Sequence, residues 1–274
     1  GFAECSRLDD TISCRMFRFG AILSEEKMKT YAFMLSLICA SLSFSAFADD
    51  HAPNIIFGES YNFSTTNPAA VVEAMDTWAA SETGKKSLAN ISLGQYMSNG
   101  DNEATHQIVV FHQSKEAMNE QIAMNLASSD SQEFLAKFAS VTTPVSENLF
   151  SFMGGTNKPG VISTSTPVQM LYALEVTNVA AFQKALGKLL ASDAVEAFPG
   201  NVSYGEVIAN GDNPSTHWVS FTTNDAGTML EANKAMLSSS DFQEYAQNAD
   251  SFRKVNSSWM GIGVKSWLAW SPGD

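Results

Sequence analysis

Two histidines in equivalent surroundings are the residues best suited to acid–base chemistry. His106 and His217 each follow a threonine and each begin a stretch whose alternation is typical of a β-strand. If the Asn-Gly-Asp-Asn turn before each histidine closes a hairpin symmetrically, Gln95 faces His106 and Glu206 faces His217. A carboxylate opposite an imidazole raises the pKa of the histidine and fixes its tautomer, as a general base requires. We therefore predict His217 and Glu206 as a catalytic pair, with His106 and Gln95 as their equivalents.

Other interpretations of these residues stay open. The pair can be a polar cross-strand contact that fixes the hairpin register, and its occurrence twice in the chain favours that structural role. A turn centred on Asn99-Gly100 would instead place Leu93 opposite His106. Side chains that lie beyond hydrogen-bond distance would exclude the catalytic pair.

Residues 28–48 are predicted to be a secretory signal peptide, and 1–27 to be an upstream segment. Lys29 supplies the basic start, an apolar stretch follows, and a small-residue Ala-Phe-Ala pattern ends at Ala48. Cleavage there would give a periplasmic or secreted protein with no membrane attachment. An uncleaved anchor is the alternative, although the apolar stretch is short for a span, and a lipoprotein signal at Cys39 is weaker still.

The same cleavage would create a metal site at the new N-terminus. Asp49, Asp50 and His51 would offer a free amine, two deprotonated amides and an imidazole, a square-planar set suited to Cu(II) or Ni(II). The exported part would hold no thiol for a disulfide or a metal, because the three cysteines precede the cut: Cys5, Cys14 and Cys39.

The charge of the chain excludes several partners. There are 29 acidic and 16 basic residues, giving a net charge of −13, and five of each sign precede Asp49. Because Lys and Arg drive phosphate binding, we expect neither nucleic acid nor an anionic membrane as a partner. Arg253 is the single arginine after residue 48, so bidentate clamps for phosphate or carboxylate substrates are nearly unavailable.

An internal duplication organises the elements that carry these residues. Shifting the chain by 111 residues aligns 61–138 with 172–249 without a gap, and 25 of the 78 aligned positions are identical. We expect one repeat over 49–155, a linker over 156–167 and a second repeat over 168–274.

Each repeat is predicted to run strand, helix, strand, strand, helix, strand. Asn67 caps the first helix, and Asp130 with Glu133 has the spacing of a capping box. This order is the ferredoxin-like pattern, whose uncovered sheet face the other repeat would cover. The predicted fold class is α+β: two fused ferredoxin-like (βαββαβ) repeats forming a single-chain pseudo-symmetric α/β barrel. The expected strands of the first repeat, with the last strand of the second, are 54–63, 91–98, 105–112, 148–153 and 259–266.

The element order and one segment resemble the dimeric α/β barrel superfamily, which includes antibiotic-biosynthesis-monooxygenase-like, stress-responsive and NIPSNAP-like domains. The segment is Ser-Ser-Asp-Ser-Gln-Glu-Phe at 128–134, with its partner ending at Tyr245. The resemblance covers most of the chain after residue 48 and implies a barrel lumen as the pocket.

The resemblance also implies chemistry for particular residues. Haem, which some superfamily members bind, would use His106 or His217 as an axial ligand. A cofactor-free oxygenase would need polar or aromatic residues lining the lumen, and the strand positions put forward Tyr96, Trp218 and Trp259 as ligand-binding residues.

The predicted function is binding of a small apolar or uncharged molecule in the lumen. One alternative is a cofactor-independent monooxygenase-like enzyme using His217 and Glu206. Another is a structural or interaction protein whose lumen is filled by side chains. We predict no resident cofactor beyond the Cu(II) and haem alternatives, and a monomer containing an intrachain pseudo-dimer rather than an obligate oligomer.

Overall fold

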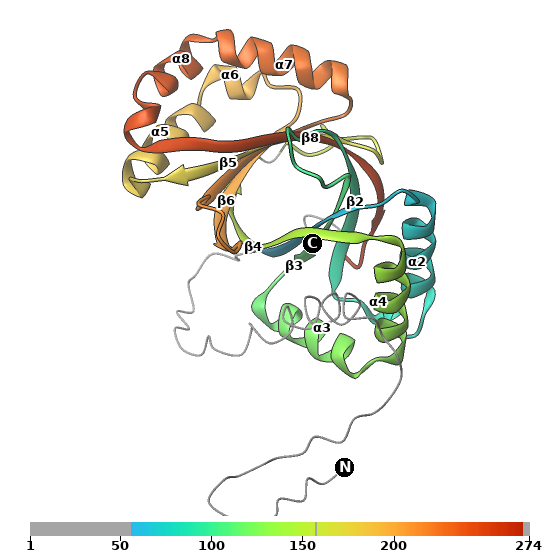
Figure 1. The fold of residues 1–274 in the computed structure, drawn as a ribbon. Coiled ribbons are helices and arrows are strands. Elements are labelled where there is room, and N and C mark those ends of the chain that lie inside the picture. The colour runs from blue at the N-terminus through green and yellow to red at the C-terminus, as the bar shows by residue number, and fades with distance from the viewer. Residues whose placement is uncertain (1–55, 157, 271–274) are drawn as a thin grey trace, which may run out of the picture. The chain divides into compact units, whose positions relative to one another are not determined.

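Eight antiparallel strands close into a barrel, with helices on its outer side (Figure 1). The computed structural model describes residues 56–156 and 158–270, called here the first and second halves. The barrel order is β1-β3-β2-β8-β5-β7-β6-β4, with β4 returning to β1. The α+β class and the barrel predicted from the sequence are confirmed.

The two halves run through their strands and longer helices in the same order, and the second half adds the short helix α6. The first half contains β1 (Phe57–Ser64), α2 (Pro68–Ala80), β2 (Ala89–Ser98), β3 (His106–His112), α3 (Lys115–Ala127), α4 (Ser129–Val141) and β4 (Thr143–Gly155). The second half contains β5 (Val168–Val176), α5 (Val179–Leu190), α6 (Asp193–Glu196), β6 (Asn201–Ala209), β7 (His217–Thr223), α7 (Ala226–Ser238), α8 (Ser240–Gln247) and β8 (Arg253–Trp267).

The last strand of each half is longer than the sequence indicated. β4 begins at Thr143 and β8 at Arg253, where strands starting at Asn148 and Trp259 were expected. Each long strand pairs with its own half first and then with the other half: β4 pairs with β1 and β6, and β8 with β5 and β2. A strand that pairs along successive segments with two different strands must be longer than one that pairs only within a hairpin.

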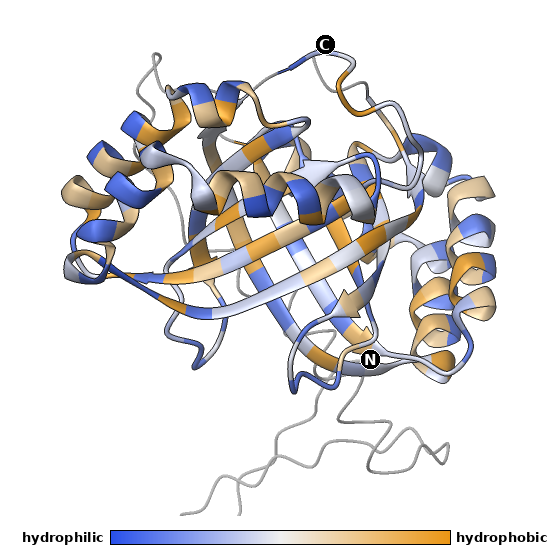
Figure 2. Ribbon diagram, turned by 90° about the horizontal axis from the view of Figure 1, so that it is seen from above, coloured by the Kyte–Doolittle hydropathy of each residue, from blue (hydrophilic) through white to orange (hydrophobic). Residues whose placement is uncertain are grey.

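Alternation along the strands separates an outer face under the helices from an inner face toward the lumen. Phe63 marks the outer face in the first half, because its ring packs 5.1 Å from Phe138 of α4. In the second half, the outer-face residues Leu174 and Val219 join one buried cluster with Phe182 of α5. Figure 2 shows hydrophobic and hydrophilic residues alternating along strands and dividing the helices into two sides.

Helix capping agrees with the sequence at the first helix of each half and differs at α4. Asn67 accepts from Ala70 N and caps α2 as predicted. The cap of α4 is Ser128, not Asp130, so the predicted capping box is wrong. Asp130 instead accepts from Thr83 N at 3.1 Å and ties α4 to the turn after α2; Asp241 binds Ala194 N in the same way, at 3.3 Å.

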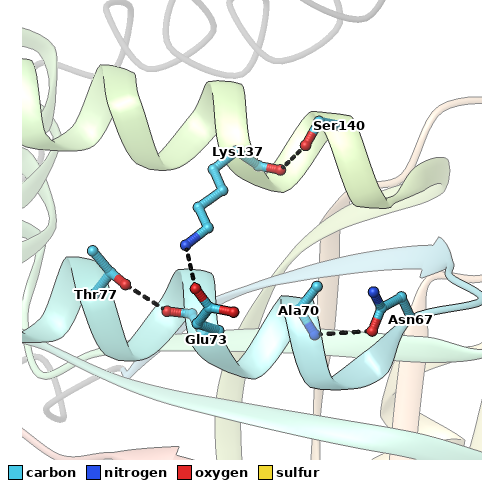
Figure 3. A network of polar contacts seen from close by, with 6 residues as sticks. All are labelled: Asn67, Ala70, Glu73, Thr77, Lys137 and Ser140. Carbon is cyan, nitrogen blue, oxygen red and sulfur yellow. Dashed lines mark hydrogen bonds and ion pairs between the residues drawn. The ribbon is translucent and has the colours of Figure 1, made fainter.

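Helices α2 and α4 lie side by side over the first half of the barrel. Lys137 of α4 reaches Glu73 of α2, with 3.0 Å between Nζ and Oε1 (Figure 3). Both side chains are largely exposed, so the pair contributes little to stability. Among the residues that the structure describes, no helix is long and apolar enough to cross a membrane.

Candidate functional site

The predicted hairpin register is correct in both halves. Gln95 lies opposite His106, and Glu206 lies opposite His217. Leu93 pairs with Ile108, so the alternative register, which placed Leu93 opposite His106, is wrong.

His217 and Glu206 do not form a hydrogen-bonded pair. The distance from His217 Nε2 to Glu206 Oε1 is 3.9 Å, and Nε2 is buried with no hydrogen-bond partner among the described residues. The other ring nitrogen, Nδ1, bonds Thr216 Oγ1 at 2.9 Å. Burial lowers the pKa of His217 by more than the charge of Glu206 raises it. The expected increase in pKa is therefore wrong.

His106 repeats this arrangement in the first half. Its Nδ1 bonds Thr105 Oγ1 at 2.8 Å, its ring stacks on Phe63 at 5.9 Å, and Nε2 has no partner. Both histidines are 4% exposed on the outer face, beneath the helices rather than in the lumen. A haem could reach either Nε2 only if the helices moved away from the sheet, so these enclosed histidines do not fit axial ligation.

The three aromatic residues predicted to line the lumen lie on the inner face. Trp218 packs between Phe150 and Phe152, with ring centroids 5.6 and 5.1 Å away. Gly205, which pairs with Trp218 in the sheet, makes room for this ring: a Cβ there would lie 2.6 Å from the indole. Aromatic side chains therefore occupy this end of the lumen, where the sequence analysis expected a ligand.

The opposite end of the lumen is polar and internally hydrogen-bonded. Tyr96 packs on Trp259 at 5.2 Å and donates to Asn62 Oδ1 at 2.5 Å. Asn62 in turn donates to Ser146 Oγ at 3.0 Å. Burial raises the pKa of Tyr96, so its hydroxyl remains protonated. These groups satisfy one another and leave few free donors for a ligand.

A cavity of about 160 Å³ lies on the outer face of the second half, between the sheet and helices α5, α7 and α8. Most of its lining is aliphatic or aromatic, from Leu174, Leu186, Leu189, Leu190, Val195, Val202, Val219, Phe221, Met236, Leu237, Phe242 and Val255. Leu237 and Val255 are 46% and 40% exposed, which places solvent access beside them. Volumes of this order accommodate one benzene-sized ring in an apolar protein interior.

Four further residues give this cavity a polar component: Tyr172, Asn233, Tyr245 and Arg253. Tyr172 donates to Met170 Sδ at 3.1 Å, and burial raises its pKa. Arg253 Nε donates to the Tyr245 hydroxyl at 3.2 Å. The sequence analysis missed the cavity because its walls carry no motif. The available signal for the cavity was Arg253, which stood out in the sequence only as the single arginine after residue 48.

A second polar cluster that the sequence analysis missed lies on the outer face of the first half. Tyr61 donates to Glu59 Oε2 at 2.5 Å, and Glu147 lies opposite Tyr61 with a buried, unpartnered Oε2. Burial raises the pKa of both carboxyls, and the charge of Glu59 raises that of Glu147 further. Perturbed carboxyls are typical of acid–base sites. Glu59, on the apolar side of the predicted strand 54–63, was the available signal, whereas Glu147 precedes the predicted strand 148–153.

Metal ligation has no support within the described ranges. Across 56–156 and 158–270, no three His, Cys, Asp or Glu residues are grouped as a metal site requires. The predicted ligands Asp49, Asp50 and His51 lie outside these ranges, as does the predicted signal peptide.

Solved structures share this fold at low sequence identity. A candidate monooxygenase from Lactobacillus acidophilus matches with a TM-score of 0.50 and 16% identity, over 77% of this chain and 94% of that one. A candidate monooxygenase from Fusobacterium nucleatum matches with 0.53 and 11%, over 80% and 96%. An anthrone oxidase-like protein matches with 0.53 and 9%, over 82% and 97%. No family model matches the chain, and no curated protein matches it in sequence. The chain therefore shares the fold of these structures, and no family is assigned.

Proposed function

We propose that the protein binds a small, mainly apolar molecule in the cavity beneath α7 and α8. The observation that carries this proposal is the cavity itself, about 160 Å³ in volume and lined mostly by apolar side chains with an accessible edge. Burial of a ring there would be favourable by about 25 cal/mol per Å² of apolar surface removed from water. The site lies under helices rather than in the lumen, where aromatic and hydrogen-bonded side chains take the space.

Closing the entrance tests this proposal. Leu237 lies on α7 at the cavity edge, and Leu126 is its equivalent on α3, with exposures of 46% and 48%. Leu237→Trp should reduce benzamide binding about tenfold or more in isothermal titration calorimetry, because the indole would cover the opening. Leu126→Trp adds the same bulk to the half without this cavity and should leave binding unchanged. Equal effects of the two variants would contradict the proposal.

A monooxygenase-like reaction is the second candidate function, because two structures of the same fold are candidate monooxygenases. His217 and Glu206 are the acid–base residues that the sequence put forward for it. Their separation of 3.9 Å and the lowered pKa of His217 weigh against it. The cavity also holds one ring rather than a fused polycyclic substrate. Aerobic conversion of anthrone to anthraquinone that His217→Gln abolishes would support this candidate, and no conversion by the unaltered protein would exclude anthrone as a substrate.

We also propose that the two halves are copies of one ferredoxin-like unit whose outer faces have diverged around the cavity of the second half. Equivalent positions explain the difference: Met236 and Tyr245 of the cavity correspond to Asn125 and Phe134 in the first half. Export after cleavage at Ala48 is part of the same proposal. Mass spectrometry of the native N-terminus tests it, since any other cut site also removes the Asp49-Asp50-His51 copper ligands.

A further inference from the structure

Arg253 stands out because, among the residues that the structure describes, its charge has no ion-pair partner in a strongly acidic protein. The part of the chain after residue 48 carries the full net charge of −13 and this single arginine. Among residues 56–156 and 158–270, no carboxylate forms an ion pair with Arg253. Glu244, the residue before Tyr245, is paired with Lys188 at 2.5 Å. Arg253 lines the cavity instead.

The Arg253 guanidinium is hydrogen-bonded through Nε, and within the described residues through no other nitrogen. Nε donates to the Tyr245 hydroxyl at 3.2 Å, and the guanidinium carbon lies 5.3 Å from the centroid of the Tyr245 ring. Next to it, Phe252 O accepts from Thr177 N at 2.9 Å and fixes the start of β8. Within the described residues, neither Nη group donates a hydrogen bond. A planar guanidinium with two free Nη groups matches the two oxygens of a carboxylate.

This Tyr–Arg contact occurs in the second half alone. Position 245 corresponds to Phe134, whose ring lacks the hydroxyl that accepts from Nε. The first half instead carries carboxylates, Glu59 and Glu147, on its outer face. The outer face of the first half thus carries carboxylates and no arginine, so an anion is favoured beside Arg253 in the second half.

We infer that the ligand of the second-half cavity is a small monocarboxylate, with its apolar ring or branched chain among the aliphatic side chains and its carboxylate on the Nη groups of Arg253. This inference rests on the proposed function, since it requires the cavity to hold the apolar part of the ligand. It replaces the uncharged ligand expected from the sequence, where one arginine in the exported part argued against anion binding.

Benzoate and benzamide test this inference, because they share shape and size and differ in charge. At physiological salt, benzoate should bind the full chain about tenfold more tightly than benzamide, the difference typical of a charge-assisted hydrogen bond. Arg253→Gln should remove this preference, so that benzoate and benzamide bind the variant about equally, and Arg253→Lys should retain part of it. Tyr245→Phe, which copies the first half, should weaken benzoate binding several-fold by releasing Nε. Circular dichroism checks that each variant is folded.

The outcomes separate the inference from the function on which it rests. Equal binding of benzoate and benzamide would keep the apolar site and overturn the role of Arg253. A benzoate preference that survives in Arg253→Gln would overturn it as well. Binding of neither compound to the unaltered protein would overturn the proposed function and the inference together.

Discussion

His112 is the buried residue whose protonation should affect folding most. It is 2% exposed, neither ring nitrogen has a hydrogen-bond partner within 56–156 and 158–270, and burial lowers its pKa to about 4. When the pKa of a histidine is lower in the folded state than in the unfolded state, the free energy of unfolding is highest above pH 6.5, the unfolded pKa. It decreases as the pH falls from 6.5 toward 4, because the unfolded state then binds a proton that the folded state does not. From pH 7 to 5 the loss is about 2 kcal/mol.

The second half suggests a replacement for His112, because Thr223 occupies the equivalent position and is fully buried. His112→Thr leaves a smaller side chain and should lower stability at pH 7. Between pH 7 and 5, the free energy of unfolding of this variant should decrease by about 2 kcal/mol less than that of the unaltered protein. Urea unfolding at both pH values measures the difference. An identical pH dependence in both proteins would contradict the assignment.

Glu147 should show the opposite pH dependence. Its raised pKa means that the folded state favours the protonated carboxyl, so stability is lost as the pH rises through the folded value. Glu147→Gln should therefore stabilise the protein at pH 8 relative to pH 4.5, by about 0.5 kcal/mol once solvent screening is allowed for. Glu120→Gln, at an exposed helix position, is the control and should show no such gain. A larger gain in the control would contradict the account.

The cross-strand partner of a residue could be predicted where spacing along the chain determines it. Properties that depend on tertiary packing could not be predicted. The Asn-Gly-Asp-Asn turns determine which residue faces His106 and His217, so both pairs could be predicted. The pKa of His217 depends on how deeply the helices bury the ring, which spacing along one strand does not contain. The roles of Arg253 and Tyr245 depend on a contact between β8 and α8.

Glycines in the strands determine which side chains fit inside the barrel. A Cβ at Gly205 would lie 1.8 Å from Ser151 O and 2.6 Å from the Trp218 ring, whereas a Cβ at the equivalent Gly94 finds nothing nearer than 3.5 Å. Gly205→Ala should cost about 1–3 kcal/mol through overpacking, and Gly94→Ala should be near neutral. Thermal unfolding of the two variants measures the contrast, and equal melting temperatures would contradict it.

The order of the elements could be predicted from the sequence, because capping residues, turns and the repeat mark them independently. The lengths of β4 and β8 could not: the missed segments, 143–147 and 253–258, are the parts that pair with β1 and β5 of the same half. The strand positions placed Trp218 in the lumen, but they did not indicate the rings of Phe150 and Phe152 that pack against it.

In the whole barrel, the edge strands of each half pair with strands of the other half of the same chain. β2 pairs with β8, and β4 with β6, so the contacts that a dimer of separate units would supply are made within one chain. We predict a monomer, and light scattering at micromolar concentration should return the mass of one chain. A dimer that persists on dilution would contradict this prediction.

The central claim is that a small, mainly apolar molecule binds beneath α7 and α8, and methyl NMR tests it directly. In protein labelled at the methionine methyl groups and the tryptophan indoles, benzamide should shift the Met236 signal, because Met236 lines the cavity and is 4% exposed. Met97, which is 48% exposed on β2, is the internal control and should not move. A shift of the Trp218 indole with an unchanged Met236 signal would place the ligand in the lumen and contradict the account.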